Sequence, residues 1–238
     1  APSTSTTSSH AGDTAVEPQP AAATESEAVF AIDELVGNVG PARRLVEWLE
    51  LAFQHPDLLT RLGGSTRLGV LVVGPEGVGK ATLVRSAAAA VGAQTVELTA
   101  PAVAALEPGQ ASERVHRATN DAVAAARSGR PTVLVVTDIE ALLPATSPPP
   151  LATLVLDALR SAMATPGLAL VATSATPESI DSRLRAPDLI DREIGLPLPD
   201  VSTRTELLRR LFAEVPTAEG IDWRVIAEQT PGFVVADF

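Results

Sequence analysis

The sequence predicts an α/β fold, an αβα sandwich built on a five-stranded, mainly parallel sheet. Short apolar runs alternate with longer segments of helical periodicity between residues 41 and 196. Each run is apolar nearly throughout, as in a strand that is covered on both faces. The connections between runs are long enough to hold the crossover helix that parallel neighbours require.

Five runs are expected to form the strands. They are residues 68–73, 95–98, 132–137, 168–174 and 192–196. Helices are expected where apolar residues recur every three or four positions. These segments are residues 41–54, a helix that begins near Lys80, and helices near residues 112–127 and 151–163. Beyond Pro199 the pattern becomes purely helical, with expected helices at residues 203–213 and 222–229.

The chain is expected to have three parts. Residues 1–28 are rich in Ser, Thr, Ala and Pro and have little to bury, which predicts a disordered linker. Residues 29–199 are expected to form the αβα domain. Residues 200–238 are expected to begin an all-helical lid subdomain that the chain leaves incomplete.

Composition argues against several classes of protein. A formal net charge of −11 disfavours a surface that tracks nucleic acid or anionic lipid. The absence of cysteine removes disulfides, thiolate metal sites and thiol nucleophiles. No apolar run approaches the roughly 18 residues of a spanning helix, and the N-terminus shows no signal-peptide pattern. We therefore expect neither a nucleic-acid nor a membrane partner, and a cytoplasmic location.

The stretch GPEGVGKATLV, which begins at Gly74, predicts a phosphate-binding loop. Gly74, Gly79 and Lys80 match G-x-x-x-x-G-K-[ST] at every fixed position but the last. Loop amides and the following helix N-terminus would converge on a phosphate, and Lys80, the only lysine of the sequence, would reach the β and γ phosphates. The predicted cofactor is ATP or ADP, held by Pro75, Glu76, Gly77, Val78, Gly79, Lys80, Ala81 and Thr82. The alternative is a glycine-rich turn that only links a strand to a helix.

Six stretches between residues 30 and 238 resemble, in their order, AAA+ ATPases, and most of all the first ATPase module of valosin-containing-protein-like unfoldases. They are IDELVG, HPDLL, GPEGVGK, TVLVVTDIEALLP, VATSATPESID and LIDREIGLPLPD. The resemblance implies a P-loop NTPase domain with a helical lid, ring hexamers with ATP at the subunit interfaces, and ATP-driven unfolding of protein substrates. It further implies that the adenine lies against Glu34, Leu35, Val36 and Gly37.

Several positions depart from the family pattern around Mg²⁺ and the attacking water. Ala81 stands where the family has the Mg²⁺-binding hydroxyl, and Thr82 lies about 100° away around the helix. Thr137 and Asp138 stand where the family has Asp-Glu, so the metal loses a charged partner and the base is one methylene shorter. Asp138, with Glu140 nearby, could instead ligate the metal after a backbone shift. Otherwise residues 137 and 138 only cap a strand end.

The residues that would contact the γ-phosphate also differ from the family pattern. Ser174 replaces the family's Asn, and its hydroxyl could still donate one hydrogen bond. Ala186 and Leu189 stand at the two positions of the arginines that reach a neighbouring subunit, which leaves Arg183 or Arg185 as replacements. Such an arginine is worth about 10³ to 10⁵ in rate in related phosphoryl transfer.

We therefore expect a regulatory or structural module of a homo-hexamer that binds ATP or ADP and hydrolyses ATP weakly or not at all. Mg²⁺ would be a second cofactor whose usual ligands are replaced, at Ala81 and Thr137. A competent second ATPase module on the parent chain would do the work, since the pore-facing segment, residues 104–106, lacks an aromatic side chain to grip substrate. The alternatives are an active ATPase with compensated residues, a nucleotide-free assembly scaffold and, more distantly, a small-molecule kinase.

Overall fold

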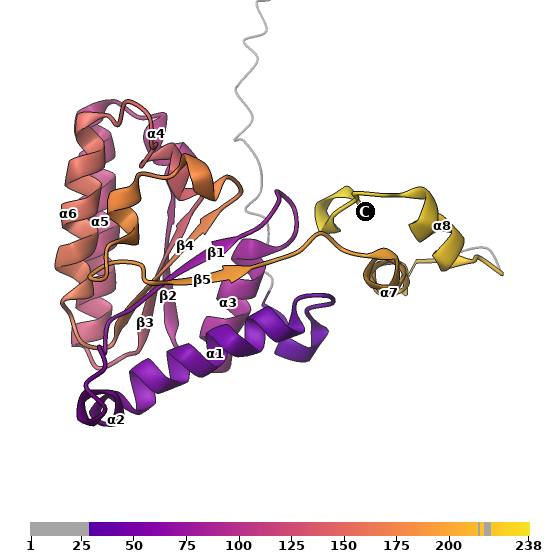
Figure 1. Cartoon of the computed structure of the whole chain (residues 1–238), viewed down its shortest axis with the longest axis horizontal. Helices are drawn as coiled ribbons and strands as arrows, with labels where there is room; N and C mark the ends of the chain where they lie inside the picture. The colour runs from indigo at the N-terminus through magenta and orange to yellow at the C-terminus, as the bar shows by residue number, and fades with distance from the viewer. Residues whose placement is uncertain (1–28, 214, 217–219) are drawn as a thin grey trace, which may run out of the picture.

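The computed structural model describes residues 29–213, 215–216 and 220–238 (Figure 1). The predicted linker, residues 1–28, lies outside the described part of the chain. Five strands form one sheet in the order β2-β3-β4-β1-β5, and all neighbours are parallel. The strands are β1 (Leu68–Val73), β2 (Gln94–Thr99), β3 (Thr132–Thr137), β4 (Leu168–Ser174) and β5 (Arg192–Gly195). The predicted five-stranded sheet is therefore confirmed.

Each of the six predicted helices is present, with small shifts at the ends. They are α1 (Val39–Gln54), α3 (Lys80–Ala90), α5 (Pro108–Arg127), α6 (Pro150–Met163), α7 (Val201–Leu211) and α8 (Trp223–Gln229). Helix α5 begins earlier than predicted because Pro108 occupies its first position, where proline's missing N–H is not needed. Two further helices, α2 (Pro56–Arg61) and α4 (Ala100–Ala104), are too short to give a periodic signal.

The sheet is buried on both faces, which explains its continuous apolar runs. In β3, Leu134 and Val136 pack in the cluster formed with α5 and α6. The alternate residues Val133 and Val135 pack in the cluster formed with α1 and α3. This period of two follows from the pleat of a strand. The two pairs of helices lie on opposite sides of the sheet (Figure 1).

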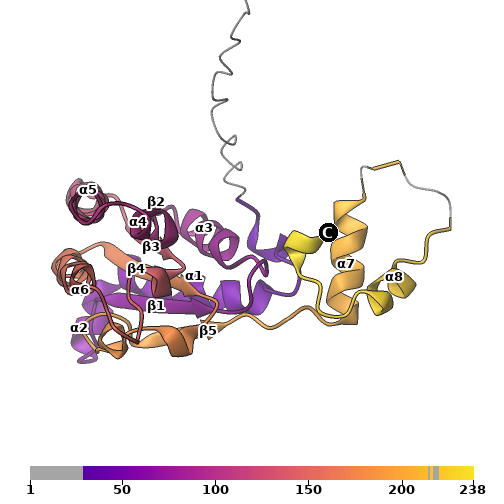
Figure 2. The same cartoon turned by 90° about the horizontal axis from the view of Figure 1, so that it is seen from above.

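The two helices of the predicted lid are joined through one buried arginine. Arg204 of α7 donates from Nε and Nη2 to the backbone oxygen of Ala227 in α8, at 3.1 and 2.8 Å. Its Nη1 donates to the backbone oxygen of Pro199, just before α7. The rings of Phe212, at the end of α7, and Trp223, at the start of α8, also stack, with centroids 5.4 Å apart. Both helices lie beyond the end of β5 (Figure 2), while the domain boundary at residue 199 stays a prediction.

Helix α5, of 20 residues, is amphipathic rather than apolar throughout. It carries charged side chains such as Glu113 and Arg117. Among the described residues, no helix has both the length and the apolar character to cross a membrane.

Candidate functional site

The segment between β1 and α3 forms a tight loop at the carboxyl edge of the sheet. Gly77 and Gly79 have φ of 74° and 92°. These values lie in the left-handed region, which is costly for a residue with a Cβ. Gly79 is the N-cap of α3. The first N–H groups of a helix have no hydrogen-bond acceptor within the helix. The loop therefore offers free amides at a helix N-terminus, the arrangement that binds a phosphate.

The side chain of Lys80 lies within this loop and is only 7% exposed. Its Nζ donates to the backbone oxygens of Gly74 and Pro75, at 2.9 and 3.0 Å. An ammonium has three N–H donors, so one remains for an incoming acceptor. The two contacts hold the positive charge against the loop, where the sequence predicts the phosphates.

The last described residues of the chain pack against the same loop. The Ala236 N–H donates to the Gly77 oxygen at 3.3 Å. A Cβ on Gly77 would lie 2.5 Å from Cγ2 of Val234 and 2.9 Å from Cβ of Ala236. Gly77 is thus required by its close neighbours as well as by its φ. Sequence reasoning missed this contact, because no local pattern relates residues so far apart in the chain.

A cavity of about 550 Å³ opens beside the loop. Several of the predicted nucleotide-binding residues line it: Glu34, Leu35, Val36, Val78, Gly79 and Thr82. Gly37 lines a smaller hollow of about 350 Å³ that shares Val36 and Val78 with the first. The other predicted binding residues, Pro75, Glu76, Gly77, Lys80 and Ala81, line neither. The cavity volume is in the range of small-molecule sites.

Helix α7 of the lid forms part of the cavity wall. Leu207, Arg210 and Leu211 of α7 line it, and Nη1 of Arg210 donates to the Glu34 oxygen at 3.1 Å. In the same cavity wall, Nδ2 of Asn38 donates to the Val78 oxygen at 3.1 Å. These two hydrogen bonds connect the predicted adenine segment to the lid and to the phosphate loop. Sequence reasoning did not identify Arg210 or Asn38.

Asp138 stands directly after β3 in an unusual conformation. Its φ of 51° and ψ of 53° are left-handed, a region that Asp tolerates better than most residues. Its N–H donates to Oγ1 of Thr173 at 3.1 Å. Burial raises the pKa of the Asp138 carboxyl, the charges of Glu140 and Glu76 raise it further, and the charge of Lys80 acts in the opposite direction. The carboxyl therefore lies within the electrostatic reach of the loop lysine.

The described residues do not fit the Mg²⁺ site implied by the sequence resemblance. Ala81 offers no oxygen, and Thr137 offers no charge. Glu140 accepts through Oε1 from Ala175 and Thr176, and its buried Oε2 has no hydrogen-bond partner among the described residues. In the described part of the chain, no group of three or more His, Asp or Glu side chains is arranged to hold a metal ion. Assignment of Asp138 as a metal ligand stays a prediction.

Ser174 is brought next to the phosphate loop by the sheet. It pairs with Val73 in the β1–β4 register, and its backbone oxygen accepts from the Gly74 N–H at 3.2 Å. Its side chain is buried, and its Oγ accepts from the Thr176 N–H at 3.1 Å. The carboxyl ends of β1, β3 and β4 thus place the loop, Asp138 and Ser174 along one edge.

The arginines considered as replacements for the trans-acting pair are paired within the chain. Arg183 donates from Nη2 to Oδ2 of Asp181 at 2.7 Å, and its hydrogen bonds hold the pKa of Asp181 below its usual value. Nη1 of Arg185 donates to Oε2 of Glu193 at 2.7 Å. Leu189, at one of the two family positions, is 2% exposed and packs in the core. A side chain so enclosed does not reach a neighbouring subunit.

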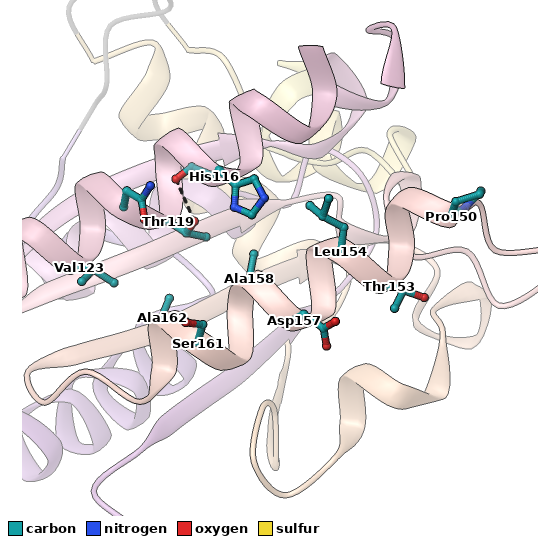
Figure 3. A pocket seen from close by; sticks show the side chains of 11 residues that line it. His116, Thr119, Val123, Pro150, Thr153, Leu154, Asp157, Ala158, Ser161 and Ala162 are labelled. Carbon is teal, nitrogen blue, oxygen red and sulfur yellow. Dashed lines mark hydrogen bonds between the residues drawn. The ribbon is translucent and has the colours of Figure 1, made fainter. Parts of the chain in front are cut away.

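A second hollow, of about 570 Å³, lies between α5 and α6 (Figure 3). His116 points from α5 toward Leu154 of α6, and Asp157 of α6 also lines the hollow. The residues that line this hollow include no Lys or Arg. It therefore lacks a charge that would neutralise a phosphate, unlike the loop beside the first cavity.

Comparison with known proteins gives a consistent result. Residues 70–198 match the family described as "ATPase family associated with various cellular activities (AAA)". The chain is similar to ATPase family gene 2 protein homolog B of Homo sapiens, with 34% identity over 200 residues, 82% of this chain and 26% of that protein. It is also similar to the Cell division cycle protein 48 homolog of Archaeoglobus fulgidus, with 29% identity over 211 residues, 86% and 28% of the two chains. The chain thus spans about a quarter of the length of these relatives.

Proposed function

Because the chain belongs to the AAA family of ATPases, we propose that it is a nucleotide-binding module that holds ATP or ADP between the phosphate loop and the lid. The observation that carries this proposal is the joint wall of the cavity of about 550 Å³, to which Glu34, Gly79 and Arg210 contribute from three separate segments. The base would lie against residues 34–37, and the phosphates against the loop amides and Lys80.

Each protein group has a role in this binding that needs no catalysis. The amides at the start of α3 and the Lys80 ammonium neutralise phosphate charge. Leu207 and Leu211 of the lid remove apolar base surface from water. Binding should also favour a closed arrangement of lid and loop, since both form the wall.

We propose in addition that the module hydrolyses ATP weakly or not at all. Ala81 and Thr137 provide none of the expected metal contacts, and Asp138 is shorter than the expected base and sits in a left-handed turn. Arg183 and Arg185 are already paired with carboxylates of the chain. Catalysis of phosphoryl transfer depends on positioning and charge stabilisation, which lower the same activation barrier. The missing metal contacts, the shorter base and the paired arginines therefore all reduce the same rate.

Family membership supports a proposal about assembly and partners. We propose that the module is part of a homo-hexameric ring that acts on protein substrates or binds protein adaptors in the cytoplasm. A second ATPase module on the parent chain would supply turnover, and relatives about four times as long have room for one. Leu106, which is 40% exposed, is the largest side chain that the predicted pore segment offers to a substrate.

Calorimetric titration with ADP and with ATP tests nucleotide binding. Wild type should bind both, and Lys80→Ala should weaken binding by at least tenfold, because a charge-assisted contact to phosphate is lost. Arg67→Ala is the matched control, since it removes one positive charge from an exposed site outside the loop. Binding that is absent in wild type, with ring assembly intact, would favour the nucleotide-free scaffold instead.

A further inference from the structure

Phe30 is the aromatic residue in the wall of the cavity proposed to hold the nucleotide. The other described side chains that line this cavity are aliphatic, polar or charged, and none of them carries an aromatic ring. Among the described residues, Phe30 therefore provides the flat π surface that the cavity offers to an occupant. A nucleobase is itself flat and aromatic, and bases stack on such side chains.

The backbone of Phe30 is bonded to the helix that follows the phosphate loop. Its N–H donates to Oγ of Ser86 at 3.0 Å, and Ser86 lies on α3 and is only 1% exposed. Helix α3 begins at Lys80, and Thr82 and Leu83 of its first turn line the same cavity. The backbone that carries the Phe30 ring is therefore held against the same helix that presents the proposed phosphate-binding amides.

The ring of Phe30 is not needed to fill the core. Phe30 belongs to neither of the two clusters of buried side chains that cover the sheet, and it remains 44% exposed. A large aromatic side chain that stays in contact with water forgoes the free energy of burial. Stacking on a bound base would remove ring surface from water, so ligand binding gives this side chain a role that packing does not.

We propose that Phe30 is a specificity-determining residue whose ring stacks on the nucleobase, so that the module prefers purine nucleotides to pyrimidine nucleotides. The inference rests on the proposed nucleotide binding and deepens it. A purine has two fused rings and a pyrimidine has one, so a purine covers more of the Phe30 ring and stacks more strongly. The loop amides and Lys80 contact phosphate instead, so the binding of phosphate alone does not depend on Phe30.

The test measures the affinities of ADP, CDP and inorganic pyrophosphate by calorimetry in wild type and in three variants. Phe30→Ala removes the ring, Phe30→Leu keeps an apolar side chain without a π surface, and Phe30→Trp keeps a larger ring. We expect Phe30→Ala to weaken ADP binding by about tenfold, as for the loss of one base-stacking contact. It should weaken CDP binding less and leave pyrophosphate binding unchanged. Phe30→Leu should lose part of the ADP affinity, and Phe30→Trp should retain it.

Phe233→Ala is the matched control for the loss of an exposed ring. Phe233 is 40% exposed, much like Phe30, and does not line the cavity. Its ring packs beside that of Phe238, with centroids 5.7 Å apart. Phe233→Ala should leave the affinity for ADP unchanged. Melting temperatures of the Phe30 variants should stay close to that of wild type, because the ring lies outside the core clusters.

Several outcomes would overturn the inference. These are an unchanged ADP affinity in Phe30→Ala, equal losses in Phe30→Ala and Phe233→Ala, or full ADP affinity in Phe30→Leu, which would show an apolar contact without stacking. Equal weakening of ADP and pyrophosphate by Phe30→Ala would mean a structural role only. A wild type that binds neither ADP nor pyrophosphate would overturn the proposed function itself, and this result is distinguishable from the others before any variant is measured.

Discussion

Arg210 and Glu34 are 176 positions apart in the chain, and Nη1 of the arginine lies 3.1 Å from the backbone oxygen of the glutamate. The contact joins the lid helix α7 to the segment predicted to face the adenine. Nε of the same guanidinium donates to Oε1 of Glu206, one turn earlier on α7. Arg210 is thereby held at the mouth of the cavity that both segments line.

Arg210→Ala is expected to weaken ADP binding by about fivefold, since one hydrogen bond between lid and domain contributes about 1 kcal/mol. The matched control is Arg209→Ala, which removes the same charge from an exposed neighbouring position of α7 that does not line the cavity. Calorimetric titration of both variants measures the difference. Equal affinities in the two variants would argue against a closing role for Arg210.

Gly77→Ala is expected to destabilise the fold by about 1–2 kcal/mol, the cost of a left-handed residue with a Cβ, and more where the new methyl meets Val234. The comparison variant is Gly109→Ala near the start of α5, where a Cβ would meet nothing within 4 Å. That substitution should be neutral or stabilising, because alanine favours a helix. Denaturant titration gives both free energies of unfolding. A tolerated Gly77→Ala would mean that the C-terminal segment does not rest on the loop.

Asp138→Asn is expected to stabilise the fold at neutral pH. Burial, followed by the charge of Glu140, raises the pKa of Asp138 above the ordinary value of 3.8, so ionisation is less favourable in the folded chain than in the unfolded chain. The unfolded chain loses its proton first, and stability therefore falls as pH rises from 3.8 through the folded-state pKa.

Asp138→Asn introduces a neutral amide, so the loss of folding stability on ionisation of this side chain no longer occurs. Melting temperatures of wild type and Asp138→Asn should therefore differ at neutral pH and converge below pH 3.8. We expect a gain below about 1 kcal/mol, since solvent screens a partly exposed group. A gain of equal size at both pH values would show that packing rather than ionisation is responsible.

Asp200→Ala is expected to loosen the first turn of α7. The Thr203 N–H donates to Oδ1 of Asp200 at 2.7 Å, and this bond, with the one from Ser202, lowers the pKa of Asp200 to about 2. A lowered pKa stabilises the fold above pH 3.8, and this contribution is lost as pH falls through about 2. Hydrogen exchange of the α7 amides at neutral pH should be faster in Asp200→Ala and nearly unchanged in Asp200→Asn, which keeps a capping oxygen. Equal exchange in the two variants would contradict the capping role.

The sheet and the loop were predictable because their signals are local. Strand β3 has a continuous apolar centre since both faces are covered, and Gly79-Lys80 follows β1 after residues 74–78. Helix α4, of five residues, gave no signal because it is shorter than two helical turns. The observed ends of the longer helices differ from the predicted ends by a few residues, because helix ends fray and caps vary.

The walls of the cavity were only half predictable. Residues 34–36 and the loop were identified from motifs and resemblance, whereas Arg210, Asn38 and Val235 were not. Their contacts depend on how the lid packs against the loop. Such tertiary contacts join distant segments and leave no pattern of residue spacing in the sequence. The contacts of Glu140 with Ala175 and Thr176 belong to the same class, because these partners lie 35 and 36 positions away.

Binding without turnover is tested by the identity of the nucleotide that stays on the protein. Wild type is incubated with Mg²⁺ and labelled ATP, desalted rapidly, and the bound nucleotide is separated and counted, with Lys80→Ala treated in parallel. We expect wild type to retain ATP and Lys80→Ala to retain little nucleotide. Labelled ADP on wild type, absent from the starting ATP and not formed by Lys80→Ala, would contradict the proposal and mean that other residues replace the missing contacts of Ala81, Thr137 and Leu189.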